Sequence, residues 1–220
     1  MRLHNCDIHA VIFDMDGLMI DTEKLYQRFW REALEFYGFH PTQQLLLDLR
    51  SLSRDLAKQL LEATFGNSIN YNLIRQKRVE LMDQYISCHG VVKKEGLDEL
   101  LEFLQENNVR MAVATATEYE RTKRYLSSID IFSYFDYIVC GTMVTNGKPA
   151  PDIYQKVIEL LELPANQCLA LEDSPNGVKS ALSAGCNAIM IPEDYNQSED
   201  IGVEKVHSLS EINDLLSKYR

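Results

Sequence analysis

Five short apolar runs, separated by helix-like stretches, constrain most strongly what this chain can fold into. Each run is four to six residues long and partly β-branched, as buried strands are. The runs are His9–Phe13, Val109–Ala114, Tyr137–Cys140, Cys168–Leu171 and Asn187–Ile191. This alternation predicts an α/β fold, with a parallel sheet covered by helices on both faces. Ser174 followed by Pro175 signals the start of one such helix, and Gly185 signals its end.

One long segment interrupts the alternation. Residues 22–89 contain amphipathic helical patterns and no buried-strand pattern. The clearest is an apolar stripe at three- and four-residue spacing, formed by Tyr26, Phe29, Trp30, Ala33, Leu34 and Tyr37. Further helices are expected at Leu56–Phe65 and Ile74–Ile86. We therefore expect a sheet domain of residues 1–20 and 92–220, with an all-helical cap domain of residues 21–91 inserted as a lid after the first strand.

The charge balance narrows the possible partners. The 220 residues carry a formal net charge of −11, which would repel the phosphates of a nucleic acid. A small anionic substrate would meet the same repulsion, so a phosphate site needs local positive charge. No stretch reaches the ~20 apolar residues that span a bilayer, and the first residues lack a signal-peptide pattern. The five cysteines show no CxxC pairing, which favours a cytoplasmic protein with reduced thiols. Nothing indicates oligomerisation, so a monomer is expected.

Reactive side chains follow the predicted strand ends. In parallel sheets, ligands bind beyond the carboxyl ends of the strands. The residues at those ends are Asp14, Asp16, Thr115, Thr117, Lys148, Glu172 and Asp173. Acidic, hydroxyl and basic groups are therefore expected to converge on one edge of the sheet.

The acidic members of this group indicate a bound cation. An extended backbone sends the side chains of Asp14 and Asp16 to the same side, where two carboxylates repel each other. Glu172 and Asp173 add further negative charge. Mg²⁺ is the expected ion, because it binds one or two carboxylates together with waters and substrate phosphate. Lys148 supplies the positive charge that a nucleophilic aspartate and a phosphate would both need.

Four segments resemble the motifs of the haloacid dehalogenase superfamily. They are VIFDMDGLMIDTE, MAVATAT, GKPAPDIY and LALEDSPNGVKSALSAG, and they occur in the family's order along the whole sheet domain. The helical insertion resembles that of the subclass containing β-phosphoglucomutase, sugar phosphatases and pseudouridine-5′-phosphatases. The resemblance implies a Rossmann-like core and an Mg²⁺-dependent phosphatase that acts on a small phosphorylated metabolite.

The resemblance also implies roles for individual residues. Asp14 matches the nucleophile that forms an aspartyl-phosphate. Asp16 matches the general acid that protonates the leaving group and then activates water. Thr115, the backbone N–H of Ala116 and Lys148 match groups that bind the phosphate oxygens.

The metal ligands that the resemblance implies are the Asp14 carboxylate, the Asp16 backbone carbonyl and Asp173, with Glu172 beside it. Other interpretations stay open at this stage. Thr115 and Asp173 are also suited to capping the following helices, and Glu172 to supporting a ligand from outside the metal's own shell. Tyr26 belongs to the apolar stripe and fits the core of the cap equally well.

A phosphomutase of the β-phosphoglucomutase type is the main alternative. Tyr26 stands where that enzyme has a cap histidine, which argues against it, whereas Arg54 aligns with its cap arginine for a second phosphate. Asp16 argues against dehalogenation and phosphonate cleavage, whose branches lack an aspartate there. The intact Asp14, Asp16 and Lys148 argue against a catalytically silent protein of this fold.

The cap is expected to determine the substrate and to move. Candidate substrate contacts are Tyr26, Arg28, Arg54 and Lys58. The cap is expected to close over the site by hinging near Gly17–Asp21 and Val91–Gly96.

Overall fold

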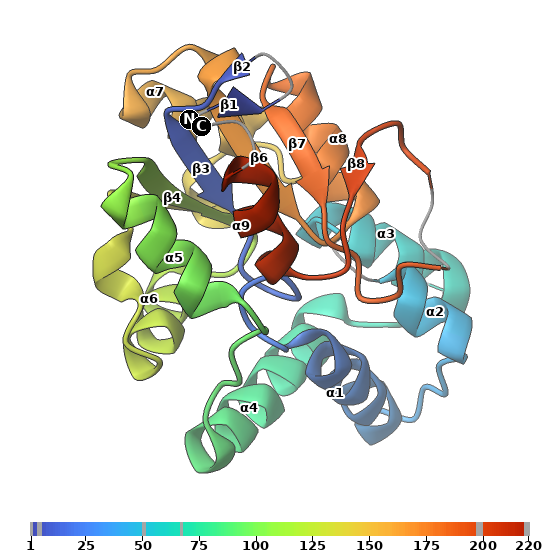
Figure 1. The fold of residues 1–220 in the computed structure, drawn as a ribbon. Helices are drawn as coiled ribbons and strands as arrows, with labels where there is room; N and C mark the ends of the chain where they lie inside the picture. Colours follow the sequence, from blue (N-terminus) through green and yellow to red (C-terminus); the bar gives the residue numbers. More distant parts are fainter. Residues whose placement is uncertain (1, 4–5, 50–51, 67, 197–199, 218–220) are drawn as a thin grey trace.

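In a computed structural model that describes residues 2–3, 6–49, 52–66, 68–196 and 200–217, a parallel sheet forms the centre of the protein (Figure 1). Its six strands lie in the order β5-β4-β3-β6-β7-β8. They are β3 (Ala10–Phe13), β4 (Arg110–Thr115), β5 (Tyr137–Cys140), β6 (Cys168–Glu172), β7 (Asn187–Met190) and β8 (Glu204–Lys205). The α/β prediction is confirmed, and each of the five apolar runs contains a strand.

The remaining strands were not predicted. β8 is two residues long, as are β1 (Arg2–Leu3) and β2 (Cys6–Asp7), which pair antiparallel outside the main sheet. A segment of two residues cannot display the alternation by which strands are detected in a sequence.

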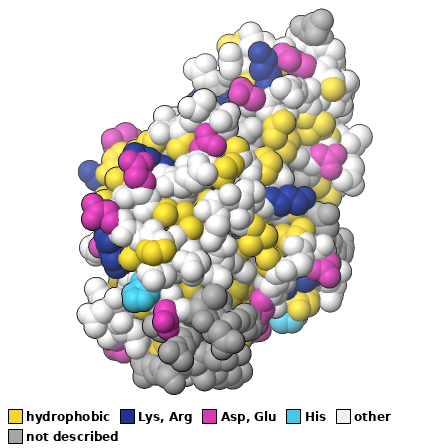
Figure 2. All heavy atoms as spheres, turned by 90° about the horizontal axis from the view of Figure 1, so that it is seen from above, with side chains coloured by type: hydrophobic (Ala, Val, Ile, Leu, Met, Phe, Trp, Pro, Cys, Tyr) yellow, Lys and Arg dark blue, Asp and Glu magenta, His cyan; other side chains and the backbone are white. Residues whose placement is uncertain are grey.

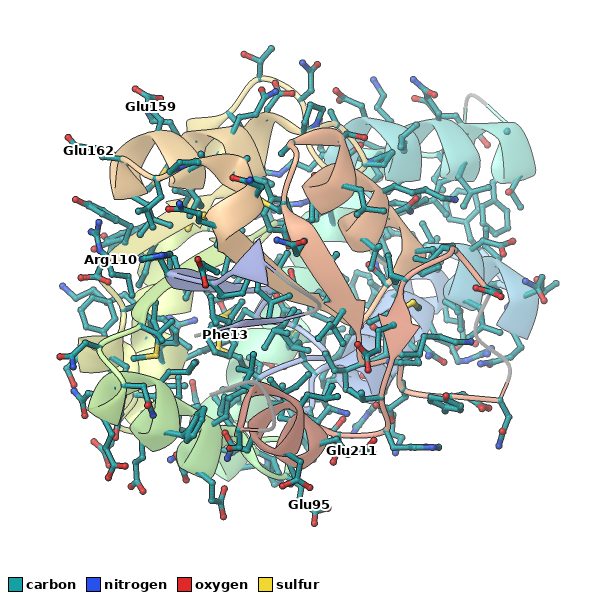
Figure 3. All side chains as sticks on the ribbon, turned by 45° about the horizontal axis from the view of Figure 1, so that its top comes forward. Phe13, Glu95, Arg110, Glu159, Glu162 and Glu211 are labelled. Carbon is teal, nitrogen blue, oxygen red and sulfur yellow. The ribbon has the colours of Figure 1, made fainter. Side chains whose placement is uncertain are left out.

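Helices cover both faces of the sheet, as expected. One face packs against α5 (Leu97–Glu106), α6 (Tyr119–Ser128) and α9 (Leu209–Ser217), and the other against α7 (Asp152–Leu161) and α8 (Pro175–Ser183). Alternate residues of β3 point to opposite faces, so Phe13 joins the first layer and Ile12 the second. Figure 3 shows Phe13 in the interior and Glu159 and Glu211 at the periphery. Three short 3-10 helices complete the connections, at Phe132–Tyr134, Gly141–Met143 and Ala165–Gln167.

Four helices lie between β3 and α5, below and to the right of the sheet in Figure 1. They are α1 (Glu23–Phe36), α2 (Gln43–Asp48), α3 (Arg54–Phe65) and α4 (Tyr71–His89). α2 was not predicted, because its six residues are too few for a helical stripe. These helices enclose a hydrophobic cluster of their own, around Trp30, Leu34 and Leu61. The division into domains at residues 21 and 91 stays a prediction.

The two connections between these helices and the sheet lie side by side. Ile20 forms an antiparallel bridge with Lys93. The Asp21 N–H donates to the Val92 carbonyl, and the Lys94 N–H donates to the Met19 carbonyl, each over 2.9 Å. The two predicted hinge segments are thus joined by backbone hydrogen bonds.

Two further properties of the chain concern membrane-spanning helices and the distribution of surface charge. None of the helices in the described ranges is both long and apolar enough to cross a membrane. On the face in Figure 2, the basic side chains of the described residues are interspersed with acidic ones.

Candidate active site

The end of β3 lies between the ends of β4 and β6. Phe13, the last residue of β3, is in register with Val113 on one side and Leu171 on the other. The backbone N–H of Asp14 donates to the Leu171 carbonyl over 3.0 Å. Asp14 therefore lies beside the residues that end β6.

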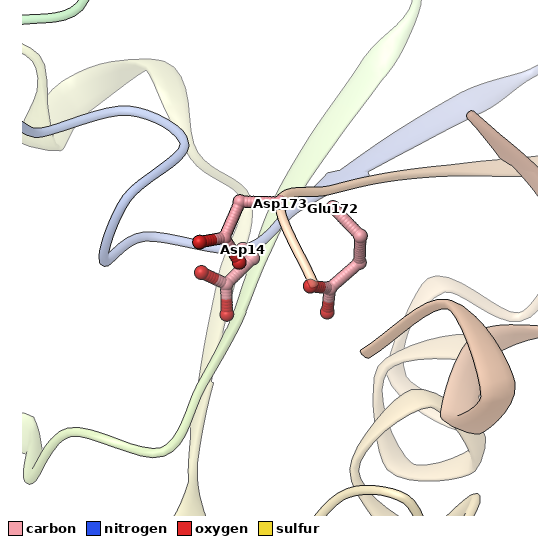
Figure 4. Close-up of side chains that lie close together, drawn as sticks. All are labelled: Asp14, Glu172 and Asp173. Carbon is pink, nitrogen blue, oxygen red and sulfur yellow. The ribbon is translucent and has the colours of Figure 1, made fainter. Parts of the chain in front are cut away.

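Three carboxylates meet at this point. Each of Asp14, Glu172 and Asp173 has an oxygen within 4.8 Å of the others', and all three residues are buried (Figure 4). The predicted convergence of acidic groups is confirmed for these three residues. The side chain of Asp16 lies outside this group.

Lys148 connects the cluster from the loop before α7. Its Nζ donates to Asp14 Oδ1 and Glu172 Oε1, each over 2.5 Å, and to the carbonyl of Ala114 over 2.9 Å. The hydroxyl of Tyr154 also donates to Glu172 Oε1, over 2.6 Å. Lys148 is 6% exposed. The predicted positive charge is therefore in contact with the predicted nucleophile.

Burial and charge determine the ionisation of these groups. Burial raises the pKa of Asp14 and of Glu172, and the charge of Lys148 opposes both rises. Burial lowers the pKa of Lys148, but the charges of Asp14 and Glu172 outweigh this effect, so its pKa is above its usual range. Lys148 therefore favours its protonated form, and burial makes each of the two carboxyl groups easier to protonate than it is in water.

Two glycines allow this dense arrangement. Gly17 has a φ of +87°, and a Cβ there would collide with Oδ2 of Asp173. Gly177 in α8 lies against the Glu172 carboxylate, which a Cβ would also strike. Glu172 Oε2 has no hydrogen-bond partner within the described residues. Close approach and a buried unpaired oxygen are features suited to a metal-binding cluster.

The carboxylate of Asp16 is oriented by two hydroxyl groups. Thr22 Oγ1 donates to Asp16 Oδ1 over 2.8 Å, and Thr117 Oγ1 donates to Oδ2 over 2.7 Å. The hydroxyl of Tyr26 lies 3.3 Å from Thr117 Oγ1. Burial raises the pKa of Asp16, and the two hydrogen bonds oppose the rise. This environment favours protonation more than water does, as a general acid requires.

Helix capping does not account for the candidate residues. The residue that precedes α6 is Glu118, and the hydroxyl of Thr115 instead accepts the N–H of Thr117 over 3.1 Å. Ser174, rather than Asp173, caps α8, as the sequence predicted: its Oγ accepts the N–H of Gly177 over 3.2 Å.

A cavity of about 290 Å³ lies between the sheet edge and the inserted helices. Asp14, Asp16, Thr115, Ala116 and Lys148 line it from the sheet. The inserted helices and the loop before α3 contribute an apolar wall that consists of Trp30, Leu46, Leu49, Leu52, Ala57 and Tyr71.

The cavity includes two of the four candidate substrate contacts. Tyr26 and Arg54 line it, while Arg28 and Lys58 do not. Arg28 forms an ion pair with Glu32 one helical turn away, and Lys58 forms one with Glu62. Such pairs are typical of solvated helix surfaces.

Sequence reasoning missed three arginines that line the cavity, namely Arg75, Arg78 and Arg121. The guanidinium of Arg78 lies 4.7 Å from the ring centroid of Tyr26 and 4.9 Å from that of Trp30. Arg78 is 6% exposed, and its Nε has no hydrogen-bond partner among the described residues. The three-residue spacing of Arg75 and Arg78 indicated a shared helix face, but only tertiary packing brings that face to the cavity.

Comparison with known proteins relates this arrangement to a family. The family model described as haloacid dehalogenase-like hydrolase matches residues 11–191. A phosphorylated carbohydrates phosphatase of Thermotoga maritima is 35% identical over 183 residues, covering 83% of this chain and 84% of that protein. A probable pseudouridine-5′-phosphatase of Drosophila melanogaster is 31% identical over 189 residues, covering 83% and 80%. A crystal structure of a putative β-phosphoglucomutase from Thermotoga maritima matches with a TM-score of 0.75 at 30% identity, covering 97% of this chain and 100% of that one.

Proposed function

Because this chain belongs to the family of haloacid dehalogenase-like hydrolases, we propose that it hydrolyses a small phosphorylated metabolite through an aspartyl-phosphate at Asp14. The enzyme class, a phosphoric monoester hydrolase, follows from the family and from its phosphatase relatives. The observation that carries the proposal is the contact of Lys148 with Asp14 in the cavity that both residues line. A sugar phosphate or a nucleotide-like monoester is the proposed substrate class, and the cytoplasm is the proposed location.

Mg²⁺ is the proposed cofactor, and the residues present fit it. Asp14, Glu172 and Asp173 supply clustered oxygen atoms, and Gly17 leaves room for the approach of Asp173. The backbone carbonyl of Asp16 is the proposed fourth protein ligand. When bound, the ion would withdraw negative charge from the phosphoryl oxygens.

In the first step, a carboxylate oxygen of Asp14 attacks phosphorus and the bond to the leaving oxygen breaks. Lys148 donates hydrogen bonds to the phosphoryl oxygens, together with the Thr115 hydroxyl and the Ala116 N–H. Asp16 transfers a proton to the leaving oxygen, so the product departs as a neutral alcohol.

In the second step, Asp16 acts as a base. Its carboxylate accepts a proton from water, whose oxygen attacks the phosphorus of the aspartyl-phosphate. The bond to Asp14 breaks, and inorganic phosphate leaves. Thr22 and Thr117 hold the Asp16 carboxylate in one orientation for both transfers.

Substitution of the nucleophile tests the proposal. Asp14→Asn is expected to lower phosphate release from p-nitrophenyl phosphate by at least about a thousandfold, because the amide is a poor nucleophile. Removal of Mg²⁺ with a chelator is expected to have a similar effect on the unchanged protein. An Asp14→Asn variant with full activity would exclude the covalent route. A cooperative thermal unfolding transition and an unchanged circular dichroism spectrum are the controls for folding.

A further inference from the structure

Two cavity arginines share one acidic partner from the opposite side of the cavity. Arg54 Nη2 lies 2.8 Å from Oε1 of Glu118, and Arg75 Nη2 lies 3.2 Å from the same oxygen. The arginines belong to α3 and α4 of the insertion, whereas Glu118 immediately precedes α6 of the sheet domain. Both arginines line the cavity.

The two arginines that contact Glu118 are the cavity cations with which a second anionic group of a ligand would pair. A ligand whose phosphate binds at Asp14 would extend its remaining part toward the insertion, where Arg54 and Arg75 are the partly exposed cations. Burial raises the pKa of Glu118, but the hydrogen bond and charge of Arg75 outweigh this effect and lower it. Glu118 is therefore ionised, and its carboxylate forms ion pairs with both arginines.

The other cationic side chains of the cavity each contact a carboxylate or lie against aromatic rings. Lys148 contacts Asp14, and Arg121 lies 3.3 Å from Asp83. Arg78 is covered by the rings of Tyr26 and Trp30. A single buried guanidinium beside two aromatic rings is suited to donating hydrogen bonds to hydroxyl or carbonyl oxygens of a ligand.

We infer that Glu118 is a specificity-determining residue, which restricts the site to monophosphates whose remaining part is uncharged. A bisphosphate would have to displace the Glu118 carboxylate from both arginines or leave its second phosphate unpaired. This inference rests on the proposed function. It also favours hydrolysis over a mutase reaction, because a sugar phosphomutase must hold a bisphosphate between its two transfers.

Binding of a matched ligand pair tests the inference without relying on turnover. The ligands are β-glucose 1-phosphate and β-glucose 1,6-bisphosphate, titrated calorimetrically into Asp14→Asn protein with Mg²⁺. Addition of Glu118→Gln is expected to strengthen bisphosphate binding about tenfold relative to monophosphate binding, because two partly exposed ion pairs are released. Arg75→Gln in the Glu118→Gln background is expected to reverse most of that gain.

Glu120→Gln is the matched control. It removes the same charge from an exposed position in α6, so it separates the local contact from the change in net charge. An equal change for both ligands in Glu118→Gln would overturn the inference and assign Glu118 a purely mechanical role in holding the insertion closed. Failure of the proposed function would instead appear as absence of phosphate release from p-nitrophenyl phosphate by the unchanged protein.

Discussion

At the scale of single residues, Lys148 determines the electrostatics of the site. Its ammonium group contacts two carboxylates, and a third carboxylate lies beside them. Removing one partner from a buried ion pair leaves an uncompensated charge, which costs several kcal/mol. The arrangement therefore links catalysis to the ionisation of Asp14 and Glu172, and both have a raised pKa because they are buried.

This ionisation predicts how pH affects stability when metal is removed. A carboxyl group with a higher pKa in the folded than in the unfolded protein binds protons more readily when folded. Its contribution to stability is present below the unfolded-state pKa and is lost as pH rises through the folded-state pKa. The melting temperature of the metal-free protein is thus expected to fall as pH rises from the ordinary carboxyl range through the raised pKa values of these two groups.

Mg²⁺ is expected to reduce this loss, because the ion binds the ionised carboxylates. Thermal unfolding at several pH values, with chelator and with Mg²⁺, measures both effects. Asp14→Asn removes one titrating group and is expected to flatten the metal-free curve. A metal-free melting temperature that rises with pH over this interval would contradict the assignment.

The roles of single residues could be predicted from the sequence only in part. Asp14 directly follows the end of one predicted strand, and Asp173 is the second residue after the end of another, so parallel pairing alone brings them together. The contact of Thr117 with Asp16 joins residues 101 positions apart, and the contacts of Arg75 and Arg78 depend on how α4 packs. Such contacts between distant residues cannot be predicted from local sequence patterns.

At the scale of elements, the turn after β3 joins the acidic cluster to the first of the two predicted hinge segments. Gly17 follows Asp16 directly and precedes the segment that leads into α1. Its left-handed backbone lets the Asp173 carboxylate lie against it. The position of the hinge and the shape of the acidic cluster therefore depend on the same residue.

Gly17→Ala is expected to weaken Mg²⁺ binding by about tenfold or more, because the new Cβ displaces Asp173. The strained backbone is also expected to cost about 1–3 kcal/mol of stability. The Mg²⁺ dependence of activity and thermal unfolding measure the two effects.

Gly38→Ala is the matched control for this change. Gly38 has a φ of +81°, but a Cβ there meets nothing within 4 Å. It is expected to lose stability while keeping its metal affinity. Equal metal affinity in the two variants would refute the role of Gly17.

Elements were predicted where their patterns were long. The predicted stripe lies within α1 except for its last member, Tyr37, which follows the helix and is exposed. The runs before Asp14 and Lys148 contain β3 and β5. The two-residue β8 and the six-residue α2 escaped detection because the stability of such short elements comes from tertiary packing, which leaves little periodic pattern.

At the scale of the whole molecule, two groups of polar contacts join the inserted helices to α6 and to the residue before it. Asp83 of α4 forms the centre of one such group. Its Oδ1 accepts from Arg124 over 2.8 Å and from the hydroxyl of Tyr125 over 3.3 Å, and it lies 3.3 Å from Arg121 Nε. Glu118 forms the second group, with Arg54 and Arg75. Partly exposed ion pairs contribute up to about 1 kcal/mol each, so closure is expected to be reversible.

Trp30 reports on this closure, because it is the protein's single tryptophan, lines the cavity and is 7% exposed. Asp83→Ala is expected to increase quenching of its fluorescence by acrylamide, because the more open protein admits solvent. Asp48→Ala, which alters an exposed residue of α2, is expected to leave quenching unchanged. Identical quenching in the two variants would show that Asp83 does not hold the cavity closed.

The paired connections at Ile20 and Lys93 have a consequence for how such a protein can diversify. The inserted helices leave and re-enter the sheet domain, the scaffold, at adjacent points. They can therefore be exchanged as a cassette, because a replacement segment needs only to begin and end equally close together. Asp14 and Asp16, the proposed catalytic residues, stay with the scaffold, whereas Arg54, Arg75 and Arg78 are exchanged with the cassette. One hydrolytic centre can thus acquire new substrates by recombination at two neighbouring junctions, without a change in its chemistry.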